Sequence, residues 1–317
     1  MATKSNDILV SVIICAYNRK RDVIESINSV INSKYKNIEI IYVDSKSNDD
    51  TVEIVKKLYP TVKILITDKK GVMVPRNMGA SIANGSILLF LDSDAKIISD
   101  TIDKVVNEFI KDPDLGVVGT KIVSIEDKNT IQYTASKFLE PFFFPSSKHI
   151  NDNKQYVFQV IGVCFFTTKE LFDILKGFDE DLYPYGQEDF DYCWRTWKFG
   201  KKILYIPITT YHKGTASNTS VSSKFTIEKN IVDSTANHLL IYIKNSNLMT
   251  FIELPIIYII IILYMVKRGF IFSILKAINL FFKKITIFIK KRSIDKLKWK
   301  ISDRKIFEYI TRKQNDF

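Results

Sequence analysis

Apolar and polar residues follow two different periods along the N-terminal half of the chain. Residues 9–15, LVSVIIC, form a continuous apolar and β-branched run, which is typical of a strand buried on both faces. Residues 19–31 then place Val23, Ile27 and Val30 at the spacing of one helix face. The same alternation predicts strands over 38–43, 62–66 and 87–91, and helices over 51–58 and 76–83.

Strands and helices that alternate at this spacing predict right-handed β–α–β units and an α/β fold with a mostly parallel central sheet. Ligands of such sheets bind at the carboxyl ends of the strands. The alternation weakens after about residue 112. Beyond that point we expect a strand over 155–168, a helix over 189–199 and one or two strands over 202–211.

Polar clusters stand where the predicted strands end. They are CAYNR at 15–19, VDSKSND at 43–49, FLDSDA at 90–95 and a long acidic segment at 177–195. Asp92 and Asp94 follow a fully apolar strand, and a carboxylate pair there suits a hard divalent cation that bridges diphosphate oxygens. The alternative is a turn that caps the helix beginning near Ser99, because aspartates are common in turns.

Four of these segments, in order and at matching spacing, resemble a family-2 glycosyltransferase of the GT-A fold. VSVIICAYNR resembles the family's VSVIIPxYNR, and EIIYVDSKSNDDT resembles EIIVVDDGSTDGT. Residues 71–94 resemble its GxxxARNxGxxxAxGexixFLDxD segment, and residues 177–207 its GFDE…ED…P segment. The match covers residues 8 to about 215. The resemblance implies an inverting, rhamnosyltransferase-like enzyme that transfers a sugar from a nucleotide-sugar donor to an acceptor hydroxyl.

The resemblance also assigns roles to single residues. Asp189, in the pair with Glu188, is expected to be the general base, since inversion needs one group to take the acceptor proton. Asp94 and His212 are expected to hold Mg²⁺ or Mn²⁺, which stabilises the departing diphosphate. The expected donor-binding residues are Tyr17, Arg19, Asp44, Arg76, Asp92 and Arg195. The family often has a second aspartate where this chain has Ser45, which leaves the nucleotide base open.

Basic charge is concentrated at the C-terminal end. Residues 267–317 hold 15 Lys and Arg against 4 Asp and Glu, a balance of +11, so the other 266 residues hold 31 of each and are neutral. The three cysteines are widely spaced and have no metal-binding pattern, which favours free thiols in a reducing compartment. The first ten residues lack the apolar stretch of a secretory signal, so we expect a cytoplasmic protein.

The chain is therefore expected to have a GT-A catalytic domain at 1–220 and a helical, basic region at 221–317. Residues 254–266 are apolar but shorter than the roughly 17–25 residues of a spanning helix, and a second apolar run at 270–282 contains Lys276. This pattern favours amphipathic helices on the cytoplasmic face of a membrane. A short hairpin in the membrane and a helical subdomain packed on the core are alternatives, whereas nucleic acid fits the aliphatic side chains poorly.

The expected acceptor is a lipid-linked or membrane-proximal glycan. Two other functions are compatible with the same sequence. A nucleotidyltransferase would also use an α/β sheet and a carboxylate-held metal, but it has less use for the pair Glu188 and Asp189. A non-catalytic nucleotide-sugar-binding membrane protein would not need an intact set of Asp94, Asp189 and His212.

Overall fold

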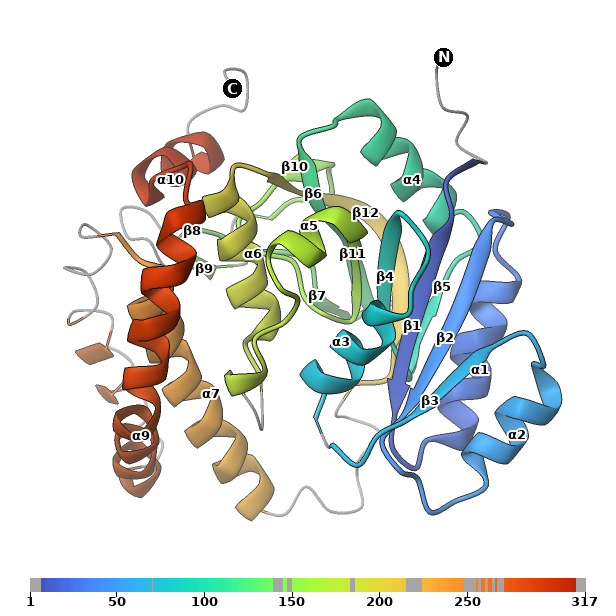
Figure 1. Cartoon of the computed structure of the whole chain (residues 1–317), viewed down its shortest axis with the longest axis horizontal. Helices are drawn as coiled ribbons and strands as arrows, with labels where there is room; N and C mark the ends of the chain where they lie inside the picture. The colour runs from blue at the N-terminus through green and yellow to red at the C-terminus, as the bar shows by residue number, and fades with distance from the viewer. Residues whose placement is uncertain are drawn as a thin grey trace.

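The computed structural model describes residues 7–69, 71–138, 145–146, 150–182, 186–214, 224–247 and 271–311, with single positions between 255 and 266. Strands and helices alternate through the first half, as the periodicity predicts (Figure 1). Their bounds are β1 Val10–Ala16, α1 Lys20–Ile31, β2 Ile38–Asp44, α2 Thr51–Leu58, β3 Lys63–Ile66, α3 Met73–Ser81, β4 Ile87–Asp92, β5 Ala95–Ile97 and α4 Thr101–Lys111. The predicted α/β fold is confirmed.

The central sheet has the order β10-β12-β6-β11-β4-β1-β2-β3. Its other strands are β6 Leu115–Ser124, β7 Ile131–Tyr133, β10 Gln155–Tyr156, β11 Cys164–Thr168 and β12 Lys202–His212. The β4-β1-β2-β3 half is parallel, but β11 runs antiparallel to both β4 and β6. The sheet as a whole is therefore mixed, because β11 lies between β4 and β6 and runs antiparallel to both of them.

The strand predicted over 155–168 is two strands, and this correction matters for the site. Its first part, β10, pairs with β12 near the sheet edge, whereas its second part, β11, lies in the centre between β4 and β6. The chain must cross between these places, so residues 157–163 leave the sheet. Gly162 lies in this crossing.

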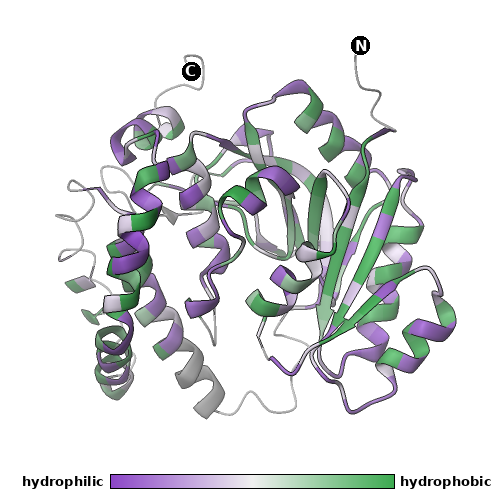
Figure 2. Cartoon of the chain, in the orientation of Figure 1, coloured by the Kyte–Doolittle hydropathy of each residue, from purple (hydrophilic) through white to green (hydrophobic). Residues whose placement is uncertain are grey.

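Helices cover both faces of the sheet, and successive residues of a strand point to opposite faces. In β1, Ile13 belongs to a core with α3, α5 (Lys169–Ile174) and α6 (Glu188–Phe199), while Val12 and Ile14 face α1, α2 and α4. Figure 2 shows the central strands as the most hydrophobic part of the molecule. Burial on both faces explains why β1 and β4 have continuous apolar sequences.

The C-terminal helices share the first of these cores. They are α7 Lys224–Asn245, α9 Ile271–Asp295 and α10 Asp303–Thr311. Tyr242 of α7 and Phe288 of α9 are fully buried in the same cluster as Trp194 of α6. The boundary at residue 220 stays a prediction, but helices on both sides of it pack into one hydrophobic core.

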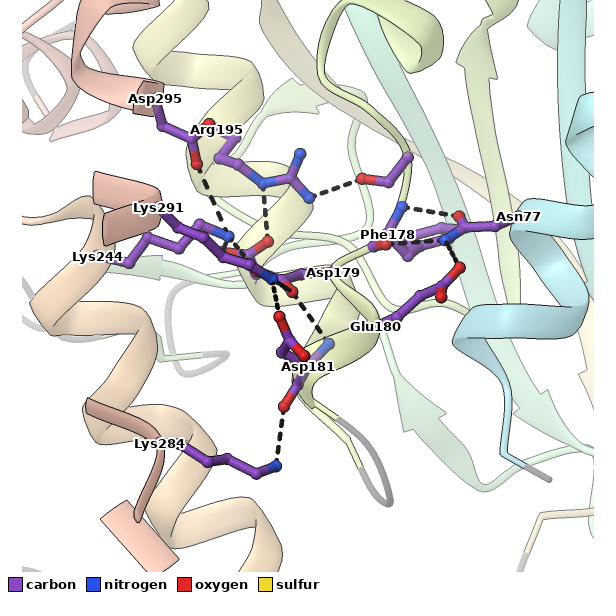
Figure 3. Close-up of polar contacts among 12 residues, drawn as sticks. Asn77, Phe178, Asp179, Glu180, Asp181, Arg195, Lys244, Lys284, Lys291 and Asp295 are labelled. Carbon is purple, nitrogen blue, oxygen red and sulfur yellow. Dashed lines mark hydrogen bonds and ion pairs between the residues drawn. The ribbon is translucent and has the colours of Figure 1, made fainter. Parts of the chain in front are cut away.

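A buried network of ion pairs also joins α6 to the C-terminal helices (Figure 3). Lys244 of α7 lies 2.7 Å from Asp179 and 2.9 Å from Asp191, and its side chain is only 2% exposed. Lys291 of α9 pairs with Asp179 as well. Burial alone would raise the pKa of Asp179, but the charges of both lysines outweigh it and hold the pKa well below its usual value. Some lysines of the basic C-terminal region therefore form ion pairs inside the protein.

The other part of the tail faces outward. None of the helices within the described residues is long and apolar enough to cross a membrane. The apolar run at 254–266 lies mostly outside the described residues, so the structure neither supports nor contradicts a hairpin there.

The network predicts a large effect for Lys244→Met. Loss of this ammonium leaves Asp179 and Asp191 without their shared partner in a buried place, so the free energy of unfolding should fall by about 3–5 kcal/mol. Urea unfolding followed by tryptophan fluorescence measures the change. The matched control is Lys290→Met on the exposed side of α9, for which we expect a change within about 0.5 kcal/mol. Equal stability of the two variants would show that the network does not stabilise the fold.

Candidate functional site

A cavity of about 460 Å³ opens at the carboxyl ends of β1 and β4. The strand register places Ala16 beside Asp44 and Cys15 beside Asp92, so the predicted clusters at 15–19, 43–49 and 90–95 meet at one edge. The cavity is lined in part by Tyr17, Arg19, Asp92, Asp94 and His212. Five of the predicted site residues are thus brought together by the parallel half of the sheet and by β12.

A larger cavity, of about 980 Å³, lies between α7, α9 and the segment before α10. Isoleucines and basic residues make up most of its lining, and none of its lining residues is a carboxylate or a histidine. It offers neither metal ligands nor a general base. The smaller cavity is therefore the candidate site.

Asp92, Asp94 and His212 can provide three ligand atoms that lie within 4.8 Å of one another. His212 reaches this place because the end of β12 pairs with β5, where His212 is opposite Ala95. Its Nε2 lies 3.3 Å from Oδ1 of Asp94. Two carboxylates and an imidazole suit Mn²⁺, and Mg²⁺ with additional phosphate and water oxygens. The donor set therefore fits the predicted cation.

The electrostatic surroundings keep Asp94 ionised. Burial alone would raise the pKa of Asp94, but the hydrogen bond and charge of His212 and the charge of Arg19 outweigh it and lower the pKa. Nη1 of Arg19 lies 3.3 Å from Asp94 and 3.1 Å from Asp22. An ionised carboxylate is the form that binds a metal.

Asp44 lies at the end of β2, but its carboxylate is already used by its neighbours. It is 1% exposed and accepts hydrogen bonds from the hydroxyl of Tyr42 at 2.5 Å, the backbone N–H of Ser47 at 2.6 Å and the hydroxyl of Ser47 at 2.7 Å. These bonds shape the loop after β2. The contact of Asp44 with a nucleotide base stays a prediction, and Ser45 is the residue of this segment that lines the cavity.

Arg76 lies behind the cavity. Its guanidinium is buried and donates to Asp92 at 2.7 Å, to Glu188 at 2.9 Å and to the carbonyl oxygen of Gly162 at 2.8 Å. It does not belong to the cavity lining. Its contact with the donor stays a prediction, and the contacts in this structure position Asp92 and Glu188, since buried charges need partners.

Asp189 lies on the other side of this arginine, at the start of α6. The backbone N–H of Gly162 donates to its Oδ2 at 3.0 Å, and that of Phe190 donates to its Oδ1 at 2.7 Å. Burial and the negative charge of Glu188 raise the pKa of Asp189 to about 7, although both N–H groups and Arg76 act in the opposite direction. A partly exposed carboxylate with this pKa can accept a proton near neutral pH.

Arg195 is the predicted donor-binding residue that the structure places elsewhere. It is buried, bonded to Asp191 at 2.7 Å and to the carbonyl oxygens of Leu175 and Gly177 (Figure 3). Position 195 is on the same helix as Asp189, but the side chain faces the ion-pair network with α7. The geometry gives it a structural role and no contact with the cavity.

Gly162 is a residue that sequence reasoning missed. Its backbone joins the two halves of the site, since its N–H donates to Asp189 and its carbonyl oxygen accepts from Arg76. A Cβ at this position would lie 2.9 Å from Nη1 of Arg76, so the guanidinium would have to shift from its present contacts. A lone glycine inside an apolar run indicates that another group approaches the backbone closely, but the sequence does not show which group this is.

The model of the family described as "Glycosyl transferase family 2" matches residues 11–175, more than half of the chain. This chain belongs to that family. The match includes the ends of β1, β2 and β4 at the cavity and the first three of the four motifs, and it ends before the fourth motif and β12. The predicted membership of this family is thus confirmed.

Curated relatives match parts of this family-2 glycosyltransferase. A UDP-Glc:alpha-D-GlcNAc-diphosphoundecaprenol beta-1,3-glucosyltransferase, WfaP of Escherichia coli, is 43% identical over 88 residues, which are 27% of this chain and 35% of that protein. The chondroitin synthase of Pasteurella multocida is 32% identical over 115 residues, 35% of this chain and 12% of its own. The chain thus spans about a third or less of these relatives.

Solved structures share its fold. GalNAc-T7 with UDP, GalNAc and Mn²⁺ has a TM-score of 0.56 at 20% identity, over 74% of this chain and 47% of that one. The mannosyltransferase PcManGT of Pyrobaculum calidifontis, with GDP-Man and Mn²⁺, has a TM-score of 0.52 at 19% identity, over 74% and 63%. The predicted GT-A fold is confirmed by these similarities.

The contact between Gly162 and Arg76 predicts that Gly162→Ala impairs transfer more than it impairs folding. The added methyl displaces the guanidinium, and with it Asp92 and Glu188, so kcat/KM should fall by about 10- to 100-fold. The matched control is Gly186→Ala, where a Cβ has no neighbour within 4 Å and a φ of +77° adds only backbone strain, about 1 kcal/mol of stability. Kinetics and urea unfolding of both variants test this, and equal kcat/KM values would contradict it.

Proposed function

We propose that this enzyme transfers a sugar from a nucleoside-diphosphate sugar to an acceptor hydroxyl with inversion at the anomeric carbon, in the presence of Mn²⁺ or Mg²⁺. One observation carries the proposal. A carboxylate–imidazole cluster and a carboxylate with a raised pKa are linked through one buried guanidinium, Arg76, and one glycine, Gly162. A metal-assisted leaving group and a general base are the two functions that inverting transfer needs.

On the donor side, Asp94 and His212 would hold the cation, with Asp92 within reach. The bound ion would supply Lewis-acid stabilisation of the departing diphosphate. Tyr17, 43% exposed at the cavity, offers an aromatic surface for the nucleoside, and Arg19 offers a cation for phosphate. The nucleotides and Mn²⁺ in GalNAc-T7 and PcManGT support this assignment.

On the acceptor side, Asp189 would take the proton of the hydroxyl while its oxygen attacks the anomeric carbon. The new C–O bond forms on the face opposite the bond to the diphosphate, which breaks with its electron pair. Because a cation held by Asp94 and His212 would stabilise the negative charge of the leaving diphosphate, no general acid would be required. Glu188 has a different task, since its carboxylate is bound to Arg76 and its charge raises the pKa of Asp189.

The acceptor is proposed to be a lipid-linked or membrane-proximal glycan. The name of WfaP includes a diphosphoundecaprenol acceptor, which supports this choice. The outer side of α9 supports it independently. Apolar residues at 275, 278, 282 and 289 recur at the spacing of one helix face and are exposed, and lysines at 276, 283 and 290 follow directly beside them. Such a surface suits the interface of an anionic membrane on the cytoplasmic face.

The decisive experiment measures the release of free nucleoside diphosphate from UDP-, GDP- and dTDP-sugars, with membrane extract as the source of acceptor. We expect metal-dependent release from one donor, its loss in EDTA, and a loss of at least about 100-fold in Asp189→Asn. Donor binding should persist in this variant, because Asp189 does not line the cavity. Full activity of Asp189→Asn would refute the base assignment. No release from any donor would favour a nucleotidyltransferase or a non-catalytic binding protein.

The same assay gives the pH dependence. The base acts only when it is ionised, so kcat/KM should rise with pH and level off above the pKa of Asp189, which is about 7. Glu188→Gln keeps an acceptor for Arg76 but removes the negative charge that raises this pKa. The inflection should therefore move to lower pH in Glu188→Gln, and a shift to higher pH would contradict the model.

Membrane association is tested by sedimentation with vesicles of phosphatidylglycerol and phosphatidylcholine. Burial of a leucine or phenylalanine side chain contributes about 1.5–3 kcal/mol, so Leu275→Ser with Phe282→Ser should weaken binding by about 100-fold or more. The control is Leu58→Ser on α2, also exposed but on the opposite side of the molecule (Figure 1). Binding should also fall with salt, because the lysines contribute through charge. Equal binding of all variants would exclude α9 as the contact.

A further inference from the structure

The imidazole of His212 lies between two polar side chains. Its Nε2 is 3.3 Å from Oδ1 of Asp94, and its Nδ1 is 2.8 Å from Oε1 of Gln132. The first contact belongs to the proposed metal site. The second comes from β7, Ile131–Tyr133.

The amide of Gln132 has only one orientation that its surroundings allow. Its Nε2 lies 3.2 Å from the carbonyl oxygen of His212 and 3.4 Å from that of Lys213. Carbonyl oxygens accept only, so the group that faces them must be the NH₂. The oxygen of the amide therefore faces the imidazole. Since this oxygen can only accept, Nδ1 of His212 must carry a hydrogen. The carboxylate of Asp94 beside Nε2 also only accepts, so a cation must displace the hydrogen on Nε2 before the lone pair of that nitrogen can bind it.

The fold brings Gln132 to this position through the hairpin of β6 and β7. The end of β6 pairs with the end of β12, where Ser124 is opposite His212, and the N–H of Ile125 donates to the carbonyl oxygen of His212 at 3.1 Å. The chain then turns back so that Gln132 reaches over the same peptide. Gly214, at a φ of +67°, leaves this space open, because a Cβ there would lie 3.2 Å from Nε2 of Gln132.

We propose that Gln132 is a positioning residue of the metal site, which holds His212 in the Nδ1–H tautomer and directs its Nε2 lone pair toward a cation shared with Asp94. The proposal rests on the metal site of the proposed function. It deepens that function, since the ligands alone do not determine which ring nitrogen is free. Partners of this kind behind a ligating histidine set its orientation and basicity.

The first test is the affinity for Mn²⁺ alone, measured by isothermal titration calorimetry without a nucleotide. Gln132→Leu should weaken Mn²⁺ binding by about 10- to 100-fold. Gln132→Glu keeps an oxygen for the Nδ1–H group and should bind closer to wild type. The control is Asn129→Leu, an exposed residue of the same hairpin, which should bind as wild type does. Unfolding curves recorded in EDTA should show that all variants are folded before metal is added.

The second test observes the tautomer without metal in the variant Asp94→Ala, which removes the carboxylate that competes for the hydrogen of the ring. The chain has three histidines, so ¹⁵N-labelled histidine gives few signals, and His212→Asn identifies those of residue 212. At about pH 9, where the ring is neutral, the shifts of Asp94→Ala should report a hydrogen on Nδ1 of His212. In the double variant Asp94→Ala with Gln132→Leu this preference should be lost.

The outcomes separate this proposal from the proposed function. Wild-type affinity of Gln132→Leu, or an Nε2–H tautomer in Asp94→Ala, would overturn the role of Gln132 and leave the metal site intact. Equal losses in the leucine and glutamate variants would also overturn it, because they would indicate packing. If the wild type does not bind Mn²⁺ and the titration of Asp94→Asn gives the same result, the metal site and this proposal are overturned together.

Discussion

The site depends on one buried cation, the guanidinium of Arg76. It neutralises Asp92 at the end of β4 and Glu188 at the start of α6, and it also donates to the carbonyl oxygen of Gly162, whose N–H bonds Asp189. A charge with so little access to water must keep all its partners, because leaving any of them unpaired is costly. The distance between the proposed metal ligands and the proposed base is therefore fixed through the contacts of a single guanidinium.

The helix that carries the base is held from its other side as well. Glu188 faces Arg76, and Asp191, three positions later, faces Lys244 and Arg195 in the network of Figure 3. The described C-terminal helices thus help to fix the orientation of α6, and with it the position of the proposed base. This arrangement explains how one basic region can supply buried lysines to the fold and exposed lysines to a proposed membrane surface.

Two carboxylates on either side of the site have opposite properties for physical reasons. Asp94 lies near His212 and Arg19, and these partners lower its pKa despite burial, which suits a metal ligand. Asp189 is half-buried beside another carboxylate, and this environment raises its pKa to about 7, which suits a base. Environments that push two pKa values apart are a common way to divide metal binding and proton transfer within one site.

The sequence by itself determined the alternation of strands and helices, the family and the edge of the sheet at which Asp92 and Asp94 meet. These features can be predicted from short segments of the sequence, because they depend on the local periodicity of apolar residues and on polar residues at strand ends. Only the tertiary structure decided the partners of Arg76 and Arg195, the crossing that splits the strand predicted over 155–168, and the contact of Gln132 with His212. The bond from Arg76 to Glu188 joins residues 112 positions apart. No local pattern encodes such a pair, because the choice among several possible carboxylates depends on which helices pack together.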